Sequence, residues 1–301
     1  DELSPEFVHL VIESTKLAFA DREAFYGDTN FNNVPMETLL SDEYNNERKN
    51  LISENASMEV RPGKIEGYEG KVVVRPKGTT PESFSKFDIG EPTVARFDEP
   101  NPNSLGETKG DTTHFDIIDK WGNMIAGTPS GGWLQSSPII PNLGFCLSNR
   151  GQMFWLDENS PACIGPKRRP RTTLSPSLAL KDGEPYMVFG TPGGDQQDQW
   201  SLHLFLRHVH FGLNLQEAID APGFSTAHFP NSFYPRETEI GHLALEGRFP
   251  KETIEALVKK GHKVSVDTDW SLGRMTAASK NNEILKAAAN PRFMQGYAIG
   301  R

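Results

Sequence analysis

Thr112 is placed where the sequence could support nucleophilic catalysis. It belongs to the run Asp111-Thr112-Thr113-His114, which leads into a segment of alternating apolar and polar residues. A threonine hydroxyl becomes a useful nucleophile when a base lies within hydrogen-bonding distance, and the α-amino group of an N-terminal threonine, with a pKa of about 7.7–8.0, is such a base. That chemistry requires a cut before Thr112, whose hydroxyl would attack the preceding carbonyl and form an ester that water releases. The competing interpretation is that a Thr-Thr pair opening a strand reflects only β-propensity.

Two glycine-containing stretches could complete such a site. Gly193 and Gly194 follow a predicted strand, and consecutive glycines in that position can present backbone N–H groups to an oxyanion. Residues 131–138, which include Gly132, are glycine-rich and polar. This second stretch suits either the lining of a site or an ordinary turn.

A hairpin and a mixed α/β scaffold are expected to position these residues. Alternation predicts strands at 114–119 and 124–128 joined by a turn, which places Thr112 at the entrance of a hairpin. Caps, apolar spacing and turn residues predict the remaining elements. The predicted helices cover 4–26, 36–52 with an interruption at 41–42, 196–211, 215–221 and 250–260, and the other strands cover 143–147, 177–180, 185–189, 262–266, 274–279 and 283–289. Residues 54–110 are predicted to form a loop and exposed linker, and residues 224–247 are a loop-rich stretch with several aromatic residues.

The composition is that of a globular protein with an acidic first segment. The 301 residues are 36% hydrophobic and 24% charged, with a net charge of −9. Residues 1–111 carry 12 Lys and Arg against 22 Asp and Glu, whereas residues 112–301 carry 19 against 18. An acidic total argues against a nucleic-acid partner, and no apolar run approaches the roughly 20 residues that span a bilayer. The chain starts without Met or a signal peptide, and we expect a preceding N-terminal part to be missing.

Neither the cysteines nor the histidines predict a structural framework or a metal site. Cys146 and Cys163 are too few for a disulfide framework, and the sequence leaves their pairing open. His203, His208 and His210 lie in one predicted helix, but His208 and His210 point to different sides of it. Since no Cys or carboxylate completes a ligand set, we predict neither a metal nor a cofactor.

Four stretches, taken in order, resemble the γ-glutamyltranspeptidase family. They are Ala18-Phe19-Ala20-Asp21-Arg22 with Gly27-Asp28, Asp111-Thr112-Thr113-His114, Arg169-Pro170-Arg171-Thr172-Thr173-Leu174-Ser175-Pro176, and Gly190-Thr191-Pro192-Gly193-Gly194. The resemblance implies an α+β fold, that of the N-terminal nucleophile hydrolases, in which two stacked sheets lie between helix layers as an αββα sandwich. It also implies one precursor that cleaves itself into residues 1–111, the end of a large subunit with a mobile linker, and residues 112–301, the catalytic small subunit.

The same resemblance implies roles for individual residues. Thr112 would be the nucleophile, its freed amine the base, and Ser130 would keep a hydroxyl where the family has a second Thr that bonds the nucleophile. Gly193 and Gly194 match the pair whose N–H groups form the oxyanion hole. Thr172 and Thr173 stand where the family has a Ser-Ser pair at the substrate.

The sequence departs from the family where the γ-glutamyl group is recognised. Gly132 replaces an Asn that holds the α-amino acid end of the substrate, and Arg150 and Met153 replace a Gln and an Asp of the next binding segment. A Met cannot replace an Asp that pairs with an ammonium group. These changes resemble the acylase-like branch, in which Arg150 could pair with a carboxylate of the acyl group or form a structural ion pair. Asp195 could contact substrate, but its type favours a helix N-cap.

The leading hypothesis is a self-processing Thr-nucleophile enzyme that forms an acyl-enzyme from an amide and passes the acyl group to water or an amine. Its partners would be the small amide, the acceptor and the two autoproteolytic fragments, with no nucleic acid and no membrane span. One alternative is true γ-glutamyl transfer from glutathione-type substrates, with recognition supplied by other residues. The other is a non-enzymatic, unprocessed homologue that serves in binding or structure.

Overall fold

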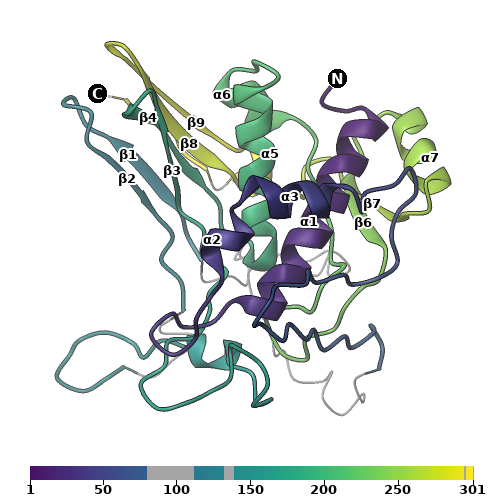
Figure 1. Ribbon diagram of the computed structural model, residues 1–301. Coiled ribbons are helices and arrows are strands. Elements are labelled where there is room, and N and C mark those ends of the chain that lie inside the picture. The colour runs from purple at the N-terminus through teal and green to yellow at the C-terminus, as the bar shows by residue number, and fades with distance from the viewer. Residues whose placement is uncertain (80–111, 132–138, 295, 301) are drawn as a thin grey trace, which may run out of the picture.

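A computed structural model describes residues 1–79, 112–131, 139–294 and 296–300 of the chain. It contains helices and mainly antiparallel sheets arranged side by side (Figure 1). The helices are α1 (Pro5–Phe25), α2 (Met36–Leu39), α3 (Asp42–Lys49), α5 (Gln197–Val209), α6 (Leu215–Asp220) and α7 (Lys251–Lys259), with short 3-10 helices η1 (Arg150–Met153), η2 (Gly194–Gln196) and η3 (Arg292–Met294). The strands are β1 (Phe115–Ile118), β2 (Met124–Gly127), β3 (Ser177–Lys181), β4 (Glu184–Gly190), β5 (Phe224–Ser225), β6 (His242–Glu246), β7 (Lys263–Asp267), β8 (Thr276–Asn281) and β9 (Ile284–Ala289).

Helix α1 is the long element of the first segment and is buried along most of its length. The Ser4 hydroxyl accepts a hydrogen bond from the Phe7 N–H, and Pro5 occupies the first turn, so the helix begins where the sequence predicted. Val8, Val11 and Ile12 pack in one core with residues of β6 and α7. Segment 1–79 therefore shares its core with the second half of the chain.

The hairpin β1–β2 lies against a four-stranded antiparallel sheet of order β3-β4-β8-β9. The pairing runs from Phe115 opposite Gly127 to Ile118 opposite Met124, and Asp119 closes the turn by accepting from the N–H groups of Trp121 and Asn123. Helices α5 and α6 lie on the other side of the four-stranded sheet (Figure 1). The two facing sheets with helices beside them confirm the predicted α+β class.

A third sheet of order β5-β6-β7 lies near α1 and α7. Strands β6 and β7 are parallel, and α7 forms the connection between them, as parallel strands require. Strand β6 lies within residues 224–247, a stretch that the sequence indicated only as loop-rich. Its sequence His-Leu-Ala-Leu-Glu is too short to show a clear period and places a charged residue, Glu246, in the core.

Residues 143–147 were predicted as a strand and do not form one. The segment makes only an isolated bridge between Ile139 and Cys146. Leu143, Phe145 and Leu147 are all exposed, so these apolar residues do not form the buried face of a sheet. The two cysteines, Cys146 and Cys163, are free thiols.

Candidate active site

The hairpin brings Thr112 and Ser130 together at its open end. The Thr113 N–H donates to the Pro129 carbonyl at 3.2 Å, which extends the antiparallel pairing of β1 and β2 by one further link. As a result Thr112 Oγ1 lies 2.6 Å from Ser130 Oγ, although the residues are 18 apart in sequence. Both side chains are half-buried. Thr112 and Ser130 are therefore joined by a hydroxyl–hydroxyl hydrogen bond.

Arg150 adds a positive charge to this pair. Its Nη2 donates to Ser130 Oγ from the first residue of η1, and the side chain is buried. The guanidinium lies 5.8 Å from the centre of the Phe233 ring, which covers it on one side. Electrostatic interactions are stronger in a buried environment than in water. The charge of Arg150 therefore polarises the hydroxyls of Thr112 and Ser130 and attracts any anionic group that binds beside them.

His114 anchors the hairpin to the four-stranded sheet, a role that the sequence analysis missed. Its Nδ1 lies 2.7 Å from Thr128 Oγ1, and its Nε2 lies 3.0 Å from Asp116 Oδ1. Asp116 in turn accepts from Thr276 Oγ1 of β8 at 2.7 Å. The ring packs directly on Gly190, where a Cβ would lie 2.4 Å from His114 Cε1. This contact holds the end of β4 against His114, which follows Thr112 by two residues in the sequence.

A tight turn carries Gly193 and Gly194 from the end of β4 into α5. Gly193 has φ 141° and Gly194 has φ 56°, backbone conformations that side chains other than glycine rarely adopt. The indole of Trp200 packs behind the turn, so that a Cβ on Gly193 would lie 2.5 Å from Trp200 Cζ3. Since Gly190 touches His114, this turn begins at the same end of the sheet as Thr112.

The loop of Thr172 and Thr173 runs beside the start of α5. The Ser175 N–H donates to Gln197 Oε1 at 3.2 Å, and the Ser175 hydroxyl donates to Asp198. Thr172 is exposed, and its hydroxyl accepts from the Leu174 N–H, whereas Thr173 is buried. The loop and the glycine turn are therefore neighbours, each fixed to the first turn of α5.

Salt bridges join the first of the quoted sequence stretches to the third and to Asp195, the residue that follows the fourth. Asp28 accepts from the Arg169 N–H at 2.8 Å and from Arg169 Nη2 at 2.9 Å, and these bonds hold the pKa of Asp28 below its ordinary value. Arg22 Nη1 lies 2.8 Å from Asp195 Oδ1. The prediction that Asp195 is a helix N-cap is wrong, because Gln196 precedes α5 and the Asp195 carboxylate bonds Ser232 and Arg22 instead.

The sequence profile of the γ-glutamyltranspeptidase family matches residues 1–300. The chain belongs to that family. Among curated proteins, the glutathione hydrolase proenzyme of Bacillus subtilis (strain 168) is 28% identical over 303 residues, which cover 100% of this chain and 46% of the relative. The solved structure of LmbA2991T421A is 48% identical with a TM-score of 0.83 and covers 100% of this chain and 50% of that one. Cephalosporin acylase from Bacillus halodurans is 26% identical with a TM-score of 0.72 over 98% of this chain and 45% of the acylase.

These likenesses show the fold of this γ-glutamyltranspeptidase-family chain and the share of each relative that it covers. The match to the acylase structure confirms the predicted fold class, that of the N-terminal nucleophile hydrolases. The chain spans about half the length of the relatives that it matches. Within the described residues, no helix is long and apolar enough to cross a membrane.

The predicted site residues of this family member divide into three groups. Thr112, Ser130 and Arg150 form one continuous hydrogen-bonded cluster. The turn of Gly193 and Gly194 and the loop of Thr172 and Thr173 are fixed near each other at the start of α5. Gly132 lies outside the described residues. Met153 is buried.

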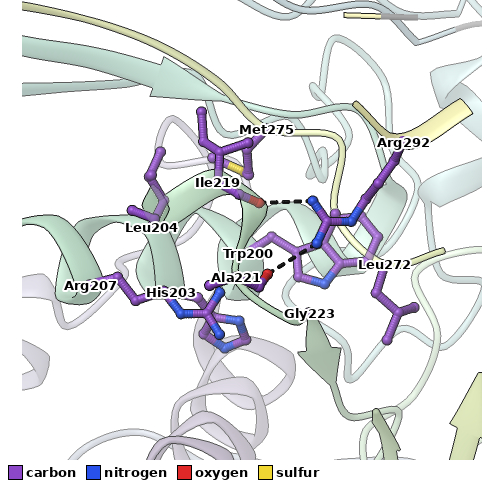
Figure 2. Close-up of a pocket in the computed structure, with 12 residues that line it drawn as sticks. Trp200, His203, Leu204, Arg207, Ile219, Ala221, Gly223, Leu272, Met275 and Arg292 are labelled. Atoms are coloured by element: carbon purple, nitrogen blue, oxygen red, sulfur yellow. Dashed lines mark hydrogen bonds between the residues drawn. The ribbon is translucent and has the colours of Figure 1, made fainter. Parts of the chain in front are cut away.

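A small cavity lies beside Trp200, between α5, α6 and the residues before β8 (Figure 2). Its volume is about 20 Å³, enough for a single water molecule and too small for an acyl substrate. Arg292 closes it by donating to the carbonyls of Ile219 at 2.8 Å and Ala221 at 3.0 Å. We therefore regard this cavity as a packing gap beside α5 and not as a substrate-binding site.

The histidines of α5 do not converge on a metal site. His203 stacks on Phe224, whereas His208 bonds the Tyr186 hydroxyl and the Leu213 carbonyl. A different group, His9, Glu13 and His262, has ligand atoms within 4.8 Å of one another. There Glu13 already accepts from Lys16 at 2.6 Å and from Arg61 at 3.2 Å, so the cations of the protein itself occupy its oxygens.

Proposed function

We propose that this protein is a self-processing amidohydrolase or acyltransferase in which Thr112 is the nucleophile. The single observation that carries the proposal is the 2.6 Å contact between Thr112 Oγ1 and Ser130 Oγ, made at the same end of the sheet as the Gly193–Gly194 turn. Family membership and the enzymes named among the relatives support it. Cleavage before Thr112 supplies the free amine that the mechanism needs.

The proposed reaction proceeds through two steps at one hydroxyl. The Thr112 amine takes the hydroxyl proton as Oγ1 attacks the amide carbonyl, and the Gly193 and Gly194 N–H groups donate to the resulting oxyanion. Collapse breaks the C–N bond, and the departing amine takes the proton, which leaves an ester on Thr112. Water or an acceptor amine then gives a proton to the same base and attacks the ester. The C–O bond breaks, the base returns the proton to Oγ1 of Thr112, and the acyl group leaves on water or the amine.

Arg150 supports a preference for acyl groups that end in a carboxylate. Its buried guanidinium contacts Ser130, one hydrogen bond away from the nucleophile, and a planar guanidinium binds a carboxylate with good geometry. The proposed substrates are therefore amides of dicarboxylic acids, such as glutaryl amides. The second candidate function is γ-glutamyl transfer, which is supported by the relative named glutathione hydrolase proenzyme. Parallel assays with glutathione and with a glutaryl anilide separate the two.

Intact mass measurement tests the catalytic role of Thr112 directly. The full-length protein and its Thr112→Ala variant are denatured and weighed after expression. We expect the wild type to give two chains separated between Asp111 and Thr112, and the variant to stay whole, because only a hydroxyl at this position can form the ester. A wild type that stays whole and is not labelled by an electrophilic acyl probe would favour the third hypothesis, a non-enzymatic homologue.

A further inference from the structure

Asp195, the residue after Gly194, is held from three directions. Its Oδ1 accepts from the Ser232 hydroxyl at 2.6 Å, its Oδ2 accepts from the Ser232 N–H at 2.7 Å, and Arg22 Nη1 lies 2.8 Å from Oδ1. The Asp195 side chain is only 2% exposed. A buried carboxylate with this many partners fixes the backbone position of its own residue, and hence of the peptide that joins it to Gly194.

The contacts continue into a closed ring of polar side chains. Arg22 also donates to Glu23 at 2.9 Å, and Glu23 accepts from Arg171 at 2.5 Å. Arg171 then returns to the Ser232 hydroxyl at 2.9 Å. The ring thus contains Arg22, Asp195, Ser232, Arg171 and Glu23, with two positive and two negative charges.

Aromatic packing and charge hold Arg22 in place within the ring. Its guanidinium carbon lies 4.0 Å from the centre of the Phe19 ring and 5.2 Å from that of Phe229. Burial alone would lower the pKa of Arg22, but the carboxylates of Asp195 and Glu23 keep it above its ordinary value. Burial alone would likewise raise the pKa of Asp195, and Arg22 with Arg171 brings it below its ordinary value. Both side chains are therefore ionised, and the charge of each one stabilises the buried charge of the other.

We propose that Arg22 is a positioning residue for the oxyanion-binding turn, which it orients through Asp195. The inference rests on the proposed function, since the turn must bind an oxyanion for its orientation to affect the rate. Gly193 and Gly194 have no side chains to restrict them, so the direction of their N–H groups depends on what fixes the neighbouring residues. Trp200 fixes the turn at Gly193, and the ring of Arg22 and Asp195 fixes it after Gly194.

The contact also crosses the proposed cleavage point. Arg22 belongs to residues 1–111, whereas Asp195, Ser232 and Arg171 belong to residues 112–301. It follows that the fragment carrying the nucleophile depends on the other fragment for the geometry of its oxyanion-binding turn, and not only for its stability.

The test compares Arg22→Gln and Arg22→Lys with an Arg48→Gln control in the full-length protein. Arg48 is a matched control because it lies in another buried salt bridge to α1, with Asp21 at 3.2 Å, and its side chain is 10% exposed against 11% for Arg22. For each variant, kcat, KM, the melting temperature and the extent of cleavage before Thr112 are measured. Asp195→Asn and the double variant Arg22→Gln/Asp195→Asn complete a cycle.

We expect Arg22→Gln to lower kcat by about 10²-fold, the loss found when one oxyanion donor is removed, while KM changes by less than about threefold. Arg22→Lys should recover part of kcat because it keeps the charge. The double variant should be no slower than the slower single variant, since both changes break one contact. Arg48→Gln should lower the melting temperature as much as Arg22→Gln does and leave kcat unchanged.

Two outcomes overturn the inference, and they differ from a failure of the proposed function. Turnover of Arg22→Gln within about threefold of the active wild type, or equal losses of kcat in Arg22→Gln and Arg48→Gln, would show that Arg22 has only a structural role. If the wild type neither cleaves itself before Thr112 nor forms an acyl-enzyme, the proposed function fails, and the positioning inference fails with it.

Discussion

At the scale of single residues, Arg150 distinguishes this site from the family pattern that the sequence resembles. A neutral Gln at this position could only exchange hydrogen bonds with a substrate, whereas the buried guanidinium also contributes a full charge beside Ser130. Hydrogen bonds to charged groups contribute about 1.5–3 kcal/mol, more than those between neutral groups. Selectivity for the acyl group should therefore depend on this one side chain.

We predict that Arg150→Gln lowers kcat/KM for a glutaryl anilide by about 10–100-fold, the equivalent of 1.5–3 kcal/mol. The same change should alter kcat/KM for an uncharged acyl anilide, such as the butyryl compound, much less. The measurement is the ratio of the two specificity constants in the wild type and the variant. An unchanged ratio would assign Arg150 to the support of Ser130 alone.

The sequence identified some residues of this site and missed others for a definite physical reason. Ser130 was paired with Thr112 through the family resemblance, and the hairpin register, with Phe115 opposite Gly127, explains why the two residues meet. The contact of Arg22 with Asp195 could not be predicted, because the two residues lie more than 170 positions apart in the sequence. No local pattern records such a contact, and it appears only when the chain folds.

At the scale of elements, local signals predicted the helices and hairpins better than the isolated strands. Ser4 and Ser41 cap α1 and α3 as their types suggest, and Asp182-Gly183 makes the turn between β3 and β4. Those features depend on neighbouring residues only. Strand β6 depends on a distant residue, because the buried charge of Glu246 is paired with Arg292, which lies 46 residues further along the chain.

The turn between β4 and α5 gives a prediction at this scale. Gly193→Ala should abolish detectable turnover, because a Cβ meets Trp200 at 2.5 Å and φ is 141°, so the turn must move. Gly183→Ala is the matched control: it too has a positive φ, 84°, but a Cβ there has open space around it. The control should lose about 1 kcal/mol of stability and keep its activity.

Activity and denaturant unfolding of both variants provide the measurement for Gly193. Full activity in Gly193→Ala would mean that the turn can relax without consequence, which would remove the structural basis for an oxyanion hole at this position. Loss of activity in both variants alike would point to a general effect of strained glycines and not to this turn.

At the scale of the whole molecule, the segments before and after Thr112 fold as one body. Val8, Val11 and Ile12 of α1 share a core with Leu243 and Leu257, beside a smaller cluster around Phe25 and Tyr44 that belongs to the first segment alone. A fragment that ended at residue 111 would expose this helix face to water, at about 25 cal/mol for each Å² of apolar surface. A cut before Thr112 should therefore leave the two parts associated.

His228 connects these two segments and makes their stability depend on pH. Its Nε2 lies 3.1 Å from the Glu59 carbonyl, and its Nδ1 accepts from the Gly241 N–H at 2.8 Å. Burial, with Lys16 nearby, lowers the pKa of His228 to about 4, against 6.5 for an exposed histidine. Between about pH 6.5 and pH 4, His228 is therefore protonated in the unfolded chain and neutral in the folded chain. The free energy of unfolding falls as the pH falls through this window.

We predict that His228→Gln reduces the loss of stability on acidification, because glutamine keeps a donor and an acceptor but does not titrate. In the wild type this histidine contributes up to about 1.4 kcal/mol of lost stability for each pH unit below 6.5, a contribution that ends near pH 4. The free energy of unfolding by urea, measured at pH 7, 6 and 5, gives the two slopes. Parallel slopes would mean that His228 is already protonated in the folded protein, or that it titrates equally in both states, and would contradict the buried neutral imidazole that joins Glu59 to Gly241.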